Sequence, residues 1–366
     1  MRILITSDTV GGVWTYTQEL VTGLVNHGHE VTLVSFGKLP LPNQTEWLRG
    51  IVGIDYRPTE YALEWMETAE RDIEESKRYL ELLIQEVRPD LLHLSQYCYS
   101  DIAAGMPKIV VAHSDIVSWW NAVHGSDPPV TPSIRRYREI VHRGLRGADL
   151  VVAPSQWMLG SLASHYGEPR AGLVVHNGRT AWRFDPNHEK QNFALSVGRL
   201  WDAGKHISLL LQREMRVPIR IVGWEHEPGR HNVENAIRVP SNVQLLGPKS
   251  QTDLCDLYAQ AAMYVGTSRY EPFGLAPLEA ALSRCVLVLN DNPVFHELWD
   301  GAALFFRKDN PDELERVVSE VASNPDLRQV YADLAHERAL SRFAASAMVN
   351  QYQTIYESIV APAEAA

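Results

Sequence analysis

Short apolar runs, each too short for a buried helix, recur along the chain and constrain its fold more than any other feature. The runs 2–6 and 30–36 enclose a stretch of helical period, and further runs follow at 89–94, 108–113 and 148–155. Strands that alternate with helices pair in parallel, because each helix carries the chain back across the sheet. The sequence therefore predicts an α/β protein built on parallel sheets.

The series of runs breaks once and then restarts. After residues 173–178 comes an aperiodic, polar stretch, 179–191, whose composition suits a linker between domains. More apolar runs follow, at 193–198, 219–223, 243–247, 261–265 and 286–289. A chain of 366 residues is also long for one core. We expect two doubly wound domains, 1–172 and 173–344, followed by a final helix and tail at 345–366.

Residues 264–280 are expected to form a buried strand, a short loop and the start of a helix. Pro272 and Gly274 mark the turn, and Pro277 is tolerated in the first turn of a helix, where the N–H groups lack partners. Gly274 also lets a ligand approach the backbone closely. The loop is therefore a place where a ligand could meet the backbone.

The same stretch carries groups for two kinds of ligand. The N–H groups of Phe273, Gly274 and Leu275 would point outward at the helix start, where an anion or sugar hydroxyls can sit. The carboxylates of Glu271 and Glu279 accept hydrogen bonds from hydroxyls. A ligand that carries both phosphate and hydroxyls, such as a nucleotide sugar, would satisfy the whole stretch.

Two other sets of residues follow predicted strands. Arg199 and Lys205 come after the run 193–198, and together they could hold neighbouring phosphates, although either alone would more often be a surface charge. Gly11 and Gly12 follow the first strand, where a ligand-binding turn and a plain tight turn weigh about equally.

His113 ends a predicted strand of the first half. A lone histidine is more often structural, but beside a carboxylate or hydroxyl it can exchange a proton near neutral pH. Trp14, Trp119 and Trp120 could stack on sugar rings or fill the core, and the sequence favours neither.

Composition excludes several classes of protein. The net charge of −11 argues against a nucleic-acid surface. Cys98, Cys255 and Cys285 stand far apart without metal spacing, which suggests buried thiols in a reducing compartment. No apolar run approaches the roughly 18 residues of a membrane span. The N-terminus enters a strand directly, so we expect no signal peptide and a cytoplasmic protein.

Missing motifs narrow the chemistry. The sequence has no P-loop, no H-E-x-x-H and no D-x-D pair that would hold a divalent cation against a diphosphate. The charge of such a ligand would have to be met by Arg199, Lys205 and helix N-termini.

Two predicted helices are rich in charge. Residues 60–88 carry an acidic face that includes Glu64 and Glu67, and residues 133–146 are rich in arginine. A solvated surface is favoured for both. For the arginine-rich helix, an acceptor patch or peripheral membrane contact is left open.

Taken in order, these residues resemble the retaining sugar-nucleotide glycosyltransferases of glycosyltransferase family 4. The resemblance runs nearly end to end and rests most on the segment 271–275 with Glu279. The other matching features are Gly11-Gly12, His113, Ala153-Pro154-Ser155, Asn177-Gly178, and Val197-Gly198-Arg199-Leu200 with Lys205. The resemblance implies the GT-B fold, in which two Rossmann-like domains face each other, the active site lies in the interdomain cleft, and a C-terminal helix crosses back to the N-terminal domain.

The resemblance also implies roles for the nucleotide-binding residues. Arg199 and Lys205 would grip the donor diphosphate, and Glu279 would bond the ribose. Gly12, with Gly11 beside it, would close over the diphosphate from the first domain, the acceptor side.

The remaining residues would contact the donor sugar. Glu271 would bond its hydroxyls, while Phe273, Gly274 and Leu275 would offer backbone N–H groups. His113 would lie near the reacting carbon. The family implies transfer with retention by a same-face route, in which the leaving phosphate helps to deprotonate the acceptor and neither a protein nucleophile nor a metal is needed.

The function expected from the resemblance is transfer of a hexose from a nucleotide diphosphate sugar, with UDP-glucose as the first guess. The acceptor would be a carbohydrate or a lipid-linked glycan, as in polysaccharide or glycoconjugate biosynthesis, with no cofactor and no partner protein. Alternatives are a sugar-nucleotide epimerase or a phosphorylase of the same fold, and a non-catalytic glycan-binding relative. One departure is that Arg284 and Cys285 stand where the family usually has a glycine, so we expect a changed turn there.

Overall fold

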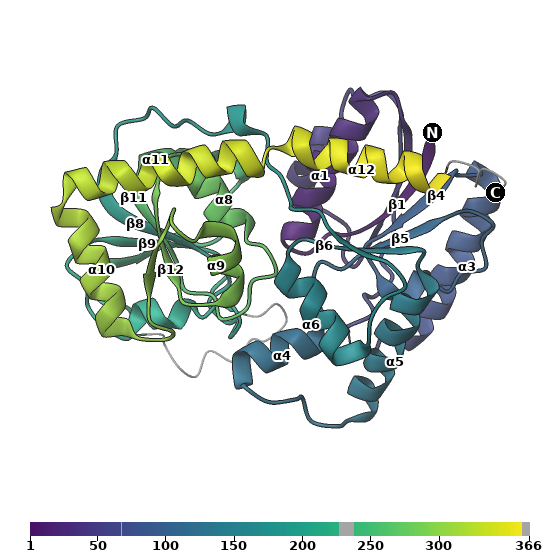
Figure 1. Ribbon diagram of the computed structural model, residues 1–366, viewed down its shortest axis with the longest axis horizontal. Coiled ribbons are helices and arrows are strands. Elements are labelled where there is room, and N and C mark those ends of the chain that lie inside the picture. Colours follow the sequence, from purple (N-terminus) through teal and green to yellow (C-terminus); the bar gives the residue numbers. More distant parts are fainter. Residues whose placement is uncertain (67, 227–237, 361–366) are drawn as a thin grey trace. The chain divides into compact units, whose positions relative to one another are not determined.

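The computed structural model describes residues 1–66, 68–226 and 238–360, which form two compact units. Unit 1 takes its described residues from Met1–Asn121, Ser126–Gly178 and Ala345–Ala366, and unit 2 from Ala122–Gly125 and Arg179–Ala344. Each unit holds one parallel sheet (Figure 1), so the expected pair of parallel α/β sheets is confirmed.

Unit 1 is built on a seven-stranded sheet with the strand order β3-β2-β1-β4-β5-β6-β7. The strands are β1 (Arg2–Asp8), β2 (Glu30–Phe36), β3 (Ile54–Pro58), β4 (Leu91–Leu94), β5 (Lys108–Val111), β6 (Leu150–Ala153) and β7 (Gly172–Val174). The interior strand β1 pairs on both sides, with Ile5 opposite Leu33 on β2 and His93 on β4. Because both faces of such a strand are covered, its middle is apolar throughout.

Helices cover both faces of this sheet. They are α1 (Gly12–Asn26), α2 (Pro42–Thr45), α3 (Glu70–Val87), α4 (Ile116–His124), α5 (Pro132–Gly147), α6 (Gln156–Tyr166) and α12 (Ala345–Val360). α1 and α12 pack together over the face that carries Ile3 and Ile5, whereas α3, α5 and α6 cover the face that carries Leu4. The return of the last helix to the first domain is therefore confirmed.

The acidic helix of unit 1 is shorter than expected. It spans Glu70–Val87 rather than 60–88. Glu64 does not lie on a solvated face but is buried, where its two oxygens accept from the first N–H groups of the 3-10 helix Tyr97–Tyr99 at 3.1 and 2.7 Å. These N–H groups have no partner within the helix, so a carboxylate stabilises them. Glu67 lies outside the described residues.

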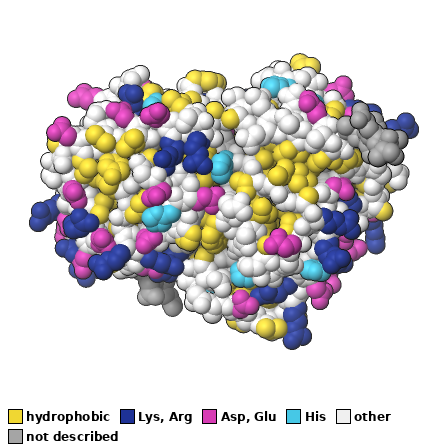
Figure 2. All heavy atoms as spheres, viewed as in Figure 1, with side chains coloured by type: hydrophobic (Ala, Val, Ile, Leu, Met, Phe, Trp, Pro, Cys, Tyr) yellow, Lys and Arg dark blue, Asp and Glu magenta, His cyan; other side chains and the backbone are white. Residues whose placement is uncertain are grey.

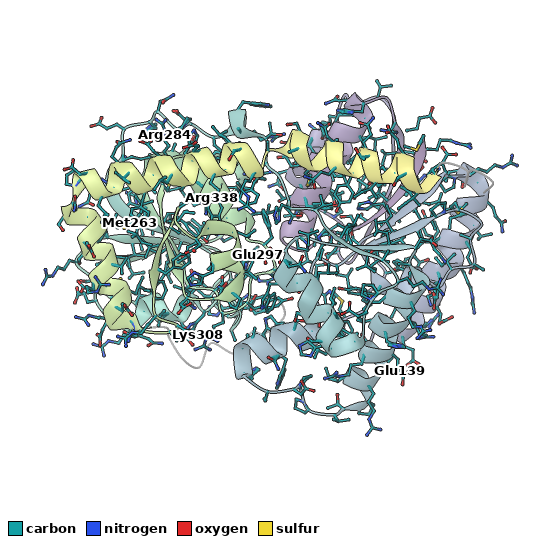
Figure 3. The ribbon with its side chains drawn as sticks, in the orientation of Figure 1. Glu139, Met263, Arg284, Glu297, Lys308 and Arg338 are labelled. Carbon is teal, nitrogen blue, oxygen red and sulfur yellow. The ribbon has the colours of Figure 1, made fainter. Side chains whose placement is uncertain are left out.

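Unit 2 is built on a six-stranded sheet with the strand order β10-β9-β8-β11-β12-β13. The strands are β8 (Gln191–Val197), β9 (Ile219–Val222), β10 (Val243–Leu245), β11 (Ala261–Gly266), β12 (Val286–Asn290) and β13 (Leu304–Phe306). Central β11 pairs with β8 and β12, and Met263 (labelled in Figure 3) lies opposite Ala194 and Val286. All six residues of β11 are buried, as the continuous apolar run predicts.

The helices of unit 2 are α7 (Gln251–Gln260), α8 (Leu275–Leu282), α9 (Pro293–Trp299), α10 (Pro311–Ser323) and α11 (Pro325–Arg342). Three of them begin with the same signal. Asn292, Asn310 and Asn324 each precede a proline, and each side chain accepts from an N–H group of the first helical turn. An asparagine cap followed by proline fixes a helix start, because the cap satisfies a free N–H and proline needs none.

The turn after α8 keeps the geometry that glycine usually provides. Arg284 has φ +55, and the N–H groups of Arg284 and Cys285 donate to the carbonyls of Ala281 and Ala280 at 3.0 and 2.9 Å. These two bonds form a Schellman motif, which places a left-handed residue after the helix. Arg284 (Figure 3) also pairs with Asp333 of α11 at 3.4 Å. The expected change of turn geometry is therefore wrong, because arginine adopts the left-handed conformation itself.

The surface charges and the cysteines say little about the function. On the face drawn in Figure 2, Lys and Arg side chains are interspersed with Asp and Glu. Cys98 and Cys285 are buried free thiols, and Cys255 is half-buried. Among the described residues, no helix has the length and apolarity needed to cross a bilayer.

Candidate functional site

The loop 267–274 follows the buried strand β11 and leads into α8. Gly274 is the N-cap of α8 and has φ +95. A Cβ at this position would lie 3.1 Å from Cγ of Glu271 and would adopt a strained backbone conformation. Glycine thus lets the loop fold back so that Glu271 lies beside the helix start.

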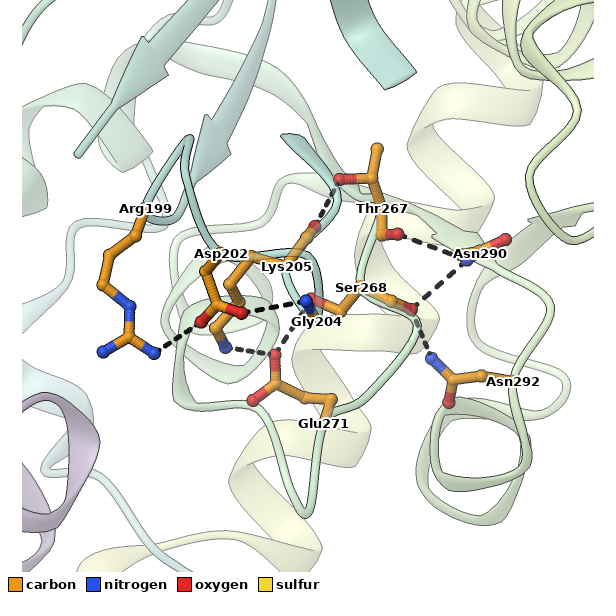
Figure 4. A network of polar contacts seen from close by, with 9 residues as sticks. All are labelled: Arg199, Asp202, Gly204, Lys205, Thr267, Ser268, Glu271, Asn290 and Asn292. Atoms are coloured by element: carbon orange, nitrogen blue, oxygen red, sulfur yellow. Dashed lines mark hydrogen bonds and ion pairs between the residues drawn. The ribbon is translucent and has the colours of Figure 1, made fainter. Parts of the chain in front are cut away.

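Glu271 forms an ion pair with Lys205, a residue 66 positions earlier. The Nζ atom of Lys205 donates to Oε2 of Glu271 at 2.6 Å, and Oγ of Ser268 donates to the same oxygen at 3.1 Å (Figure 4). The side chains are 28% and 13% exposed for Lys205 and Glu271, so the pair lies in a partly open place. Both bonds end on Oε2, which leaves Oε1 able to accept from a ligand hydroxyl.

Arg199 is held in the same loop as Lys205 by Asp202. A terminal nitrogen of the Arg199 guanidinium donates to Oδ2 of Asp202 at 2.5 Å, and the N–H of Gly204 donates to Oδ1 at 2.8 Å (Figure 4). Burial alone would raise the pKa of Asp202, but the charge and hydrogen bond of Arg199 outweigh it, so the pKa lies below its ordinary value. The backbone carbonyl of Asp202 accepts from Lys205 N–H at 3.0 Å. Asp202 therefore organises the loop that presents both cations.

Two asparagines at the end of β12 hold the loop that carries Glu271. Nδ2 of Asn292 donates to the carbonyl of Ser268 at 2.9 Å, and Nδ2 of Asn290 donates to the carbonyls of Thr267 and Ser268 at 3.2 and 3.3 Å (Figure 4). Thr267 in turn donates through Oγ1 to the carbonyl of Lys205 at 2.9 Å. Hydrogen bonds thus join the loops that follow β8, β11 and β12, and those from Asn290 and Asn292 are buried.

The loop after β9 also approaches this edge closely. Gly223 has φ +151, and a Cβ there would lie 1.9 Å from the carbonyl oxygen of Gly198, just before Arg199. Because no side chain fits in that space, the two backbones can approach this closely only with glycine at position 223.

Phe273, Gly274 and Leu275 contribute differently. The ring of Phe273 is buried and packs edge-on against Phe343, with ring centroids 5.4 Å apart and an interplanar angle of 90°. Its side chain therefore belongs to the core of unit 2. Gly274 and Leu275 begin α8, where first-turn N–H groups have no partner within the helix.

Glu279 lies about one turn into α8, eight positions after Glu271. It is buried, and its Oε1 lies 3.0 Å from Nε of Arg179, whose side chain is 1% exposed. Arg179 comes directly after the matched pair Asn177-Gly178. The two carboxylates therefore have separate cationic partners.

Strained residues lie next to this network. His206 and Asp309 both have positive φ, +49 and +59, and Nδ1 of His206 lies 3.0 Å from Oδ1 of Asp309. Arg269 donates to the other oxygen of Asp309 at 2.9 Å. Burial and the charge of Arg269 lower the pKa of His206, while Asp309 opposes that shift. Non-glycine residues with positive φ gather at functional loops, and these two adjoin Lys205 and the β11–α8 loop.

The expected residues of unit 1 lie at the ends of β1 and β5. Gly11, with φ +74, precedes α1, and Gly12 is its first residue. His113 follows β5, where its Nε2 lies 3.3 Å from Oγ of Ser95 and its ring packs edge-on against Tyr16 at 4.6 Å. Burial lowers the pKa of His113 to about 3, so its imidazole is neutral at physiological pH.

The tryptophans of unit 1 differ in exposure. Trp14 is buried, its Nε1 donates to the carbonyl of Gln44 at 2.8 Å, and it packs against Trp47 and Tyr56. It belongs to the core. Trp119 and Trp120 are half-buried and pack against each other, with centroids 6.2 Å apart.

The structure brings some of the predicted site residues together. Lys205 and Glu271 are brought together, with Arg199 in the same loop as Lys205. Sequence reasoning missed the residues that hold them, namely Asp202, Ser268, Asn290, Asn292 and Arg179. Their only signal was position, since each adjoins a matched motif or ends a strand. Over the described parts of the chain, no group of three or more His, Cys, Asp or Glu residues is placed to hold a metal ion.

Two family descriptions match the chain. Glycosyltransferase Family 4 matches residues 10–180, and Glycosyl transferases group 1 matches residues 178–338. The two matched ranges meet at residues 178–180, where the chain passes from unit 1 to unit 2. The chain belongs to the family 4 glycosyltransferases.

Relatives of known sequence support this assignment at low identity. An uncharacterized glycosyltransferase of Methanocaldococcus jannaschii, MJ1607, is 24% identical over 383 residues, which cover 95% of this chain and 94% of that protein. The O-antigen chain mannosyltransferase RfbU of Salmonella typhimurium is 23% identical over 196 residues, 52% of this chain and 56% of RfbU. The match thus spans only about half of RfbU.

Solved structures show the same fold. Sucrose-phosphate synthase from Thermosynechococcus elongatus has a TM-score of 0.79 at 15% identity and covers 99% of both chains. HepE of Anabaena, in a complex with UDP-glucose, has a TM-score of 0.74 at 16% identity and covers 98% of this chain and all of that one. At such identities the likeness establishes the fold alone, which is GT-B.

Proposed function

We propose that the chain is a retaining glycosyltransferase that moves a hexose from a nucleotide diphosphate sugar to a carbohydrate or lipid-linked acceptor, without a metal. The observation that carries this is the Lys205–Glu271 pair, with Arg199 held beside Lys205, at the edge of the unit 2 sheet. A cationic pair suits a diphosphate, and a carboxylate suits sugar hydroxyls. Residues 173–344 are proposed as the nucleotide-sugar domain, residues 1–172 as the acceptor side, and 345–366 as its returning helix and tail.

Each of the two cations is paired with a carboxylate, Arg199 with Asp202 and Lys205 with Glu271. A guanidinium has five N–H donors and an ammonium three, so neither must release its carboxylate to bind phosphate. Arg199 would meet the diphosphate with its fork and Lys205 as a point charge. The two cations would stabilise the negative charge that develops on the leaving diphosphate. This electrostatic stabilisation is the main contribution to catalysis that we assign to unit 2.

The remaining roles are those that the resemblance to the family implies. Glu271 would accept from donor-sugar hydroxyls through Oε1, and Glu279 would bond the ribose. The N–H groups at 273–275 would face the sugar or phosphate. Gly11 and Gly12 would approach the diphosphate from the first domain. His113 would contact the donor sugar as a neutral hydrogen-bonding group, since its lowered pKa makes it a poor proton donor near neutral pH.

The donor is proposed as UDP-glucose, with GDP-mannose as the second candidate. HepE was solved with UDP-glucose. RfbU is a mannosyltransferase, and a GDP-mannose:cellobiosyl-diphosphopolyprenol alpha-mannosyltransferase of Xanthomonas campestris is 34% identical over 91 residues, 24% of this chain. These relatives favour a hexose donor and a growing glycan as acceptor.

A thermal-shift panel of UDP-glucose, GDP-mannose and ADP-glucose with EDTA tests the proposal. A ligand at 100 times its dissociation constant adds about 2.7 kcal/mol, which should raise the melting temperature of a 366-residue chain by about 3 to 4 °C. One donor should give this shift, and incubation with glycan acceptors should release its nucleoside diphosphate. No shift with any donor would contradict the proposal. Isomerisation of the sugar nucleotide without an acceptor would instead support the epimerase.

A further inference from the structure

We infer that His206 and Asp309 form a positioning pair, which holds the loop of Lys205 and the loop of Glu271 in the relative placement that transfer needs. The inference rests on the proposed function, because it concerns the same two loops. Nδ1 of His206 lies 3.0 Å from Oδ1 of Asp309, and the side chains are 8% and 29% exposed. We assign neither side chain a contact with the donor, so the effect of the pair on transfer would pass through Lys205 and Glu271.

The backbone of both residues is in the left-handed region, with φ +49 at His206 and +59 at Asp309. A side chain costs free energy in this region, whereas glycine does not. Among the described residues, the other non-glycine residues with positive φ are Arg88 and Arg284, which follow the ends of α3 and α8, where this conformation is ordinary. His206 and Asp309 instead precede helices, the 3-10 helix Ile207–Leu211 and α10. Strain that is kept in loops beside a ligand site points to a use for the side chains.

The carboxylate of Asp309 joins two loops. Its Oδ1 faces His206, which directly follows Lys205 in the chain. Its Oδ2 accepts from Nε of Arg269 at 2.9 Å, and Arg269 lies two positions before Glu271. Each oxygen of the carboxylate therefore contacts a neighbour of one of the two site residues.

Asp309 is itself fixed by the end of β12. Its N–H donates to Oδ1 of Asn290 at 3.2 Å, and the amide nitrogen of Asn290 donates to the carbonyls of Thr267 and Ser268. Nδ1 of His206 and Oδ1 of Asp309 are buried, and neither has a hydrogen-bond partner elsewhere in the described parts of the chain. Burial of a polar atom is costly without a partner, so each of these two atoms depends on the other.

The two loops also meet through their backbones. The N–H groups of Arg269 and Tyr270 donate to the carbonyl of Gly204 at 2.8 and 3.2 Å. These bonds would keep the loops together after the side chain of Asp309 is removed, so a variant should fold with its site residues slightly misplaced. A misplacement of about 1 Å can cost about 100-fold in rate.

Steady-state kinetics and melting temperatures of His206→Gly and Asp309→Gly test the inference, with UDP-glucose or whichever donor the thermal-shift panel identifies. Glycine removes the side chain together with the strain, so both variants should melt within about 3 °C of wild type. Their kcat should fall by about 10- to 100-fold while KM for the donor stays within about threefold, because the groups that bind the donor are still present. The double variant should be no slower than the slower single variant.

Arg88→Gly is the matched control. Arg88 has the same backbone conformation, φ +47, but lies at the end of α3 in unit 1. This variant should keep the kcat and KM of wild type. Asp309→Asn is the conservative variant, because an amide has the shape of the carboxylate, can still accept from Arg269 and tolerates positive φ. Its kcat should stay within about threefold of wild type.

A purely structural pair gives a different result. The two glycine variants would then melt at a lower temperature but keep the kcat of wild type below it, and an unchanged kcat in either folded variant would overturn the inference. An equal fall of kcat in Asp309→Asn and Asp309→Gly would overturn it too, because the negative charge rather than the placement would then matter. If one glycine variant does not fold, the other decides. Wild type that transfers from no donor would instead count against the proposed function.

Discussion

At the scale of single residues, the two side chains proposed to bind the diphosphate are held in different ways. Arg199 is fixed by a carboxylate three positions away, whereas Lys205 is fixed by Glu271 across 66 positions. Each carboxylate fixes the orientation of its cation, and a cation with a fixed orientation needs little reorganisation in the transition state.

Lys205→Ala tests the proposed charge stabilisation. Loss of one such donor should cost about 2 to 4 kcal/mol of transition-state stabilisation, or about 30- to 1,000-fold in kcat/KM. Steady-state kinetics with the donor from the panel measures the change. Arg316→Ala, which removes an exposed cation on α10, is the control and should leave kcat/KM unchanged. Wild-type kinetics for Lys205→Ala would contradict the role.

Arg284 allows a test of backbone strain that is independent of function. Arg284→Gly should be more stable than Arg284→Ala by about 1 kcal/mol, because both lose the contact with Asp333 but only alanine keeps the cost of positive φ. Thermal unfolding of the two variants measures the difference. If the alanine variant proves equally stable, the turn must relax to another conformation.

The sequence predicted which residues belong to the candidate site, but it did not predict which of them contact each other. Glu271, Lys205 and Arg199 stood out because each follows a strand run. The Lys205–Glu271 contact depends on β8 and β11 being neighbours in the sheet, and no local pattern encodes that. Arg284 shows the opposite case, since a missing glycine suggested a new turn, but the helix-end hydrogen bonds were strong enough to keep the old one.

At the scale of elements, the site depends on strand ends that pass very close to each other. Gly223→Ala should cost more than about 3 kcal/mol, because its Cβ would overlap the carbonyl of Gly198. Gly160→Ala is a matched control in the helix α6, where a Cβ meets nothing within 4 Å, and it should be neutral or stabilising by up to about 1 kcal/mol. Denaturant unfolding measures both. Equal stability of the two variants would show that the loops can separate.

The sequence predicted whether a segment is a helix or a strand where its hydrophobic pattern was clear. It did not predict where each helix or strand begins and ends. The strands β1, β2 and β11 follow their apolar runs. The long acidic helix was extended too far, because the residues before Glu70 continue the charged pattern while a tertiary contact buries Glu64. Charge pattern alone cannot distinguish a solvated carboxylate from one that caps another helix.

At the scale of the whole molecule, α12 ties the end of the chain to the first sheet. His93 of β4 is fully buried between the hydroxyls of Tyr356 on α12, at 2.7 Å, and Tyr16 on α1, at 3.2 Å. Burial, followed by the charge of His113, lowers the pKa of His93 to about 3. The histidine is therefore neutral in the folded state over a pH range in which an unfolded chain would bind a proton.

The lowered pKa of His93 predicts that the folded protein loses stability in acid. Between about pH 6.5 and pH 3 the unfolded state binds more protons than the folded state, so stability falls as the pH falls. Between pH 7 and pH 5, the protonation of His93 in the unfolded chain lowers the free energy of unfolding by about 2 kcal/mol. His93→Gln, although less stable at pH 7, should lose about 2 kcal/mol less over this interval, and exposed His188→Gln should behave as wild type. Identical pH dependence for His93→Gln and wild type would contradict the assignment.

The central claim is that the β11–α8 loop positions the donor and supplies no nucleophile. Glu271→Gln tests it most directly, by comparing the donor dissociation constant with the rate of transfer. Loss of one hydrogen bond to a charged group predicts binding within about tenfold of wild type and transfer slower by about 10- to 100-fold. Intact binding with transfer slower by about 10⁶-fold, as expected when a covalent nucleophile is removed, would contradict the claim.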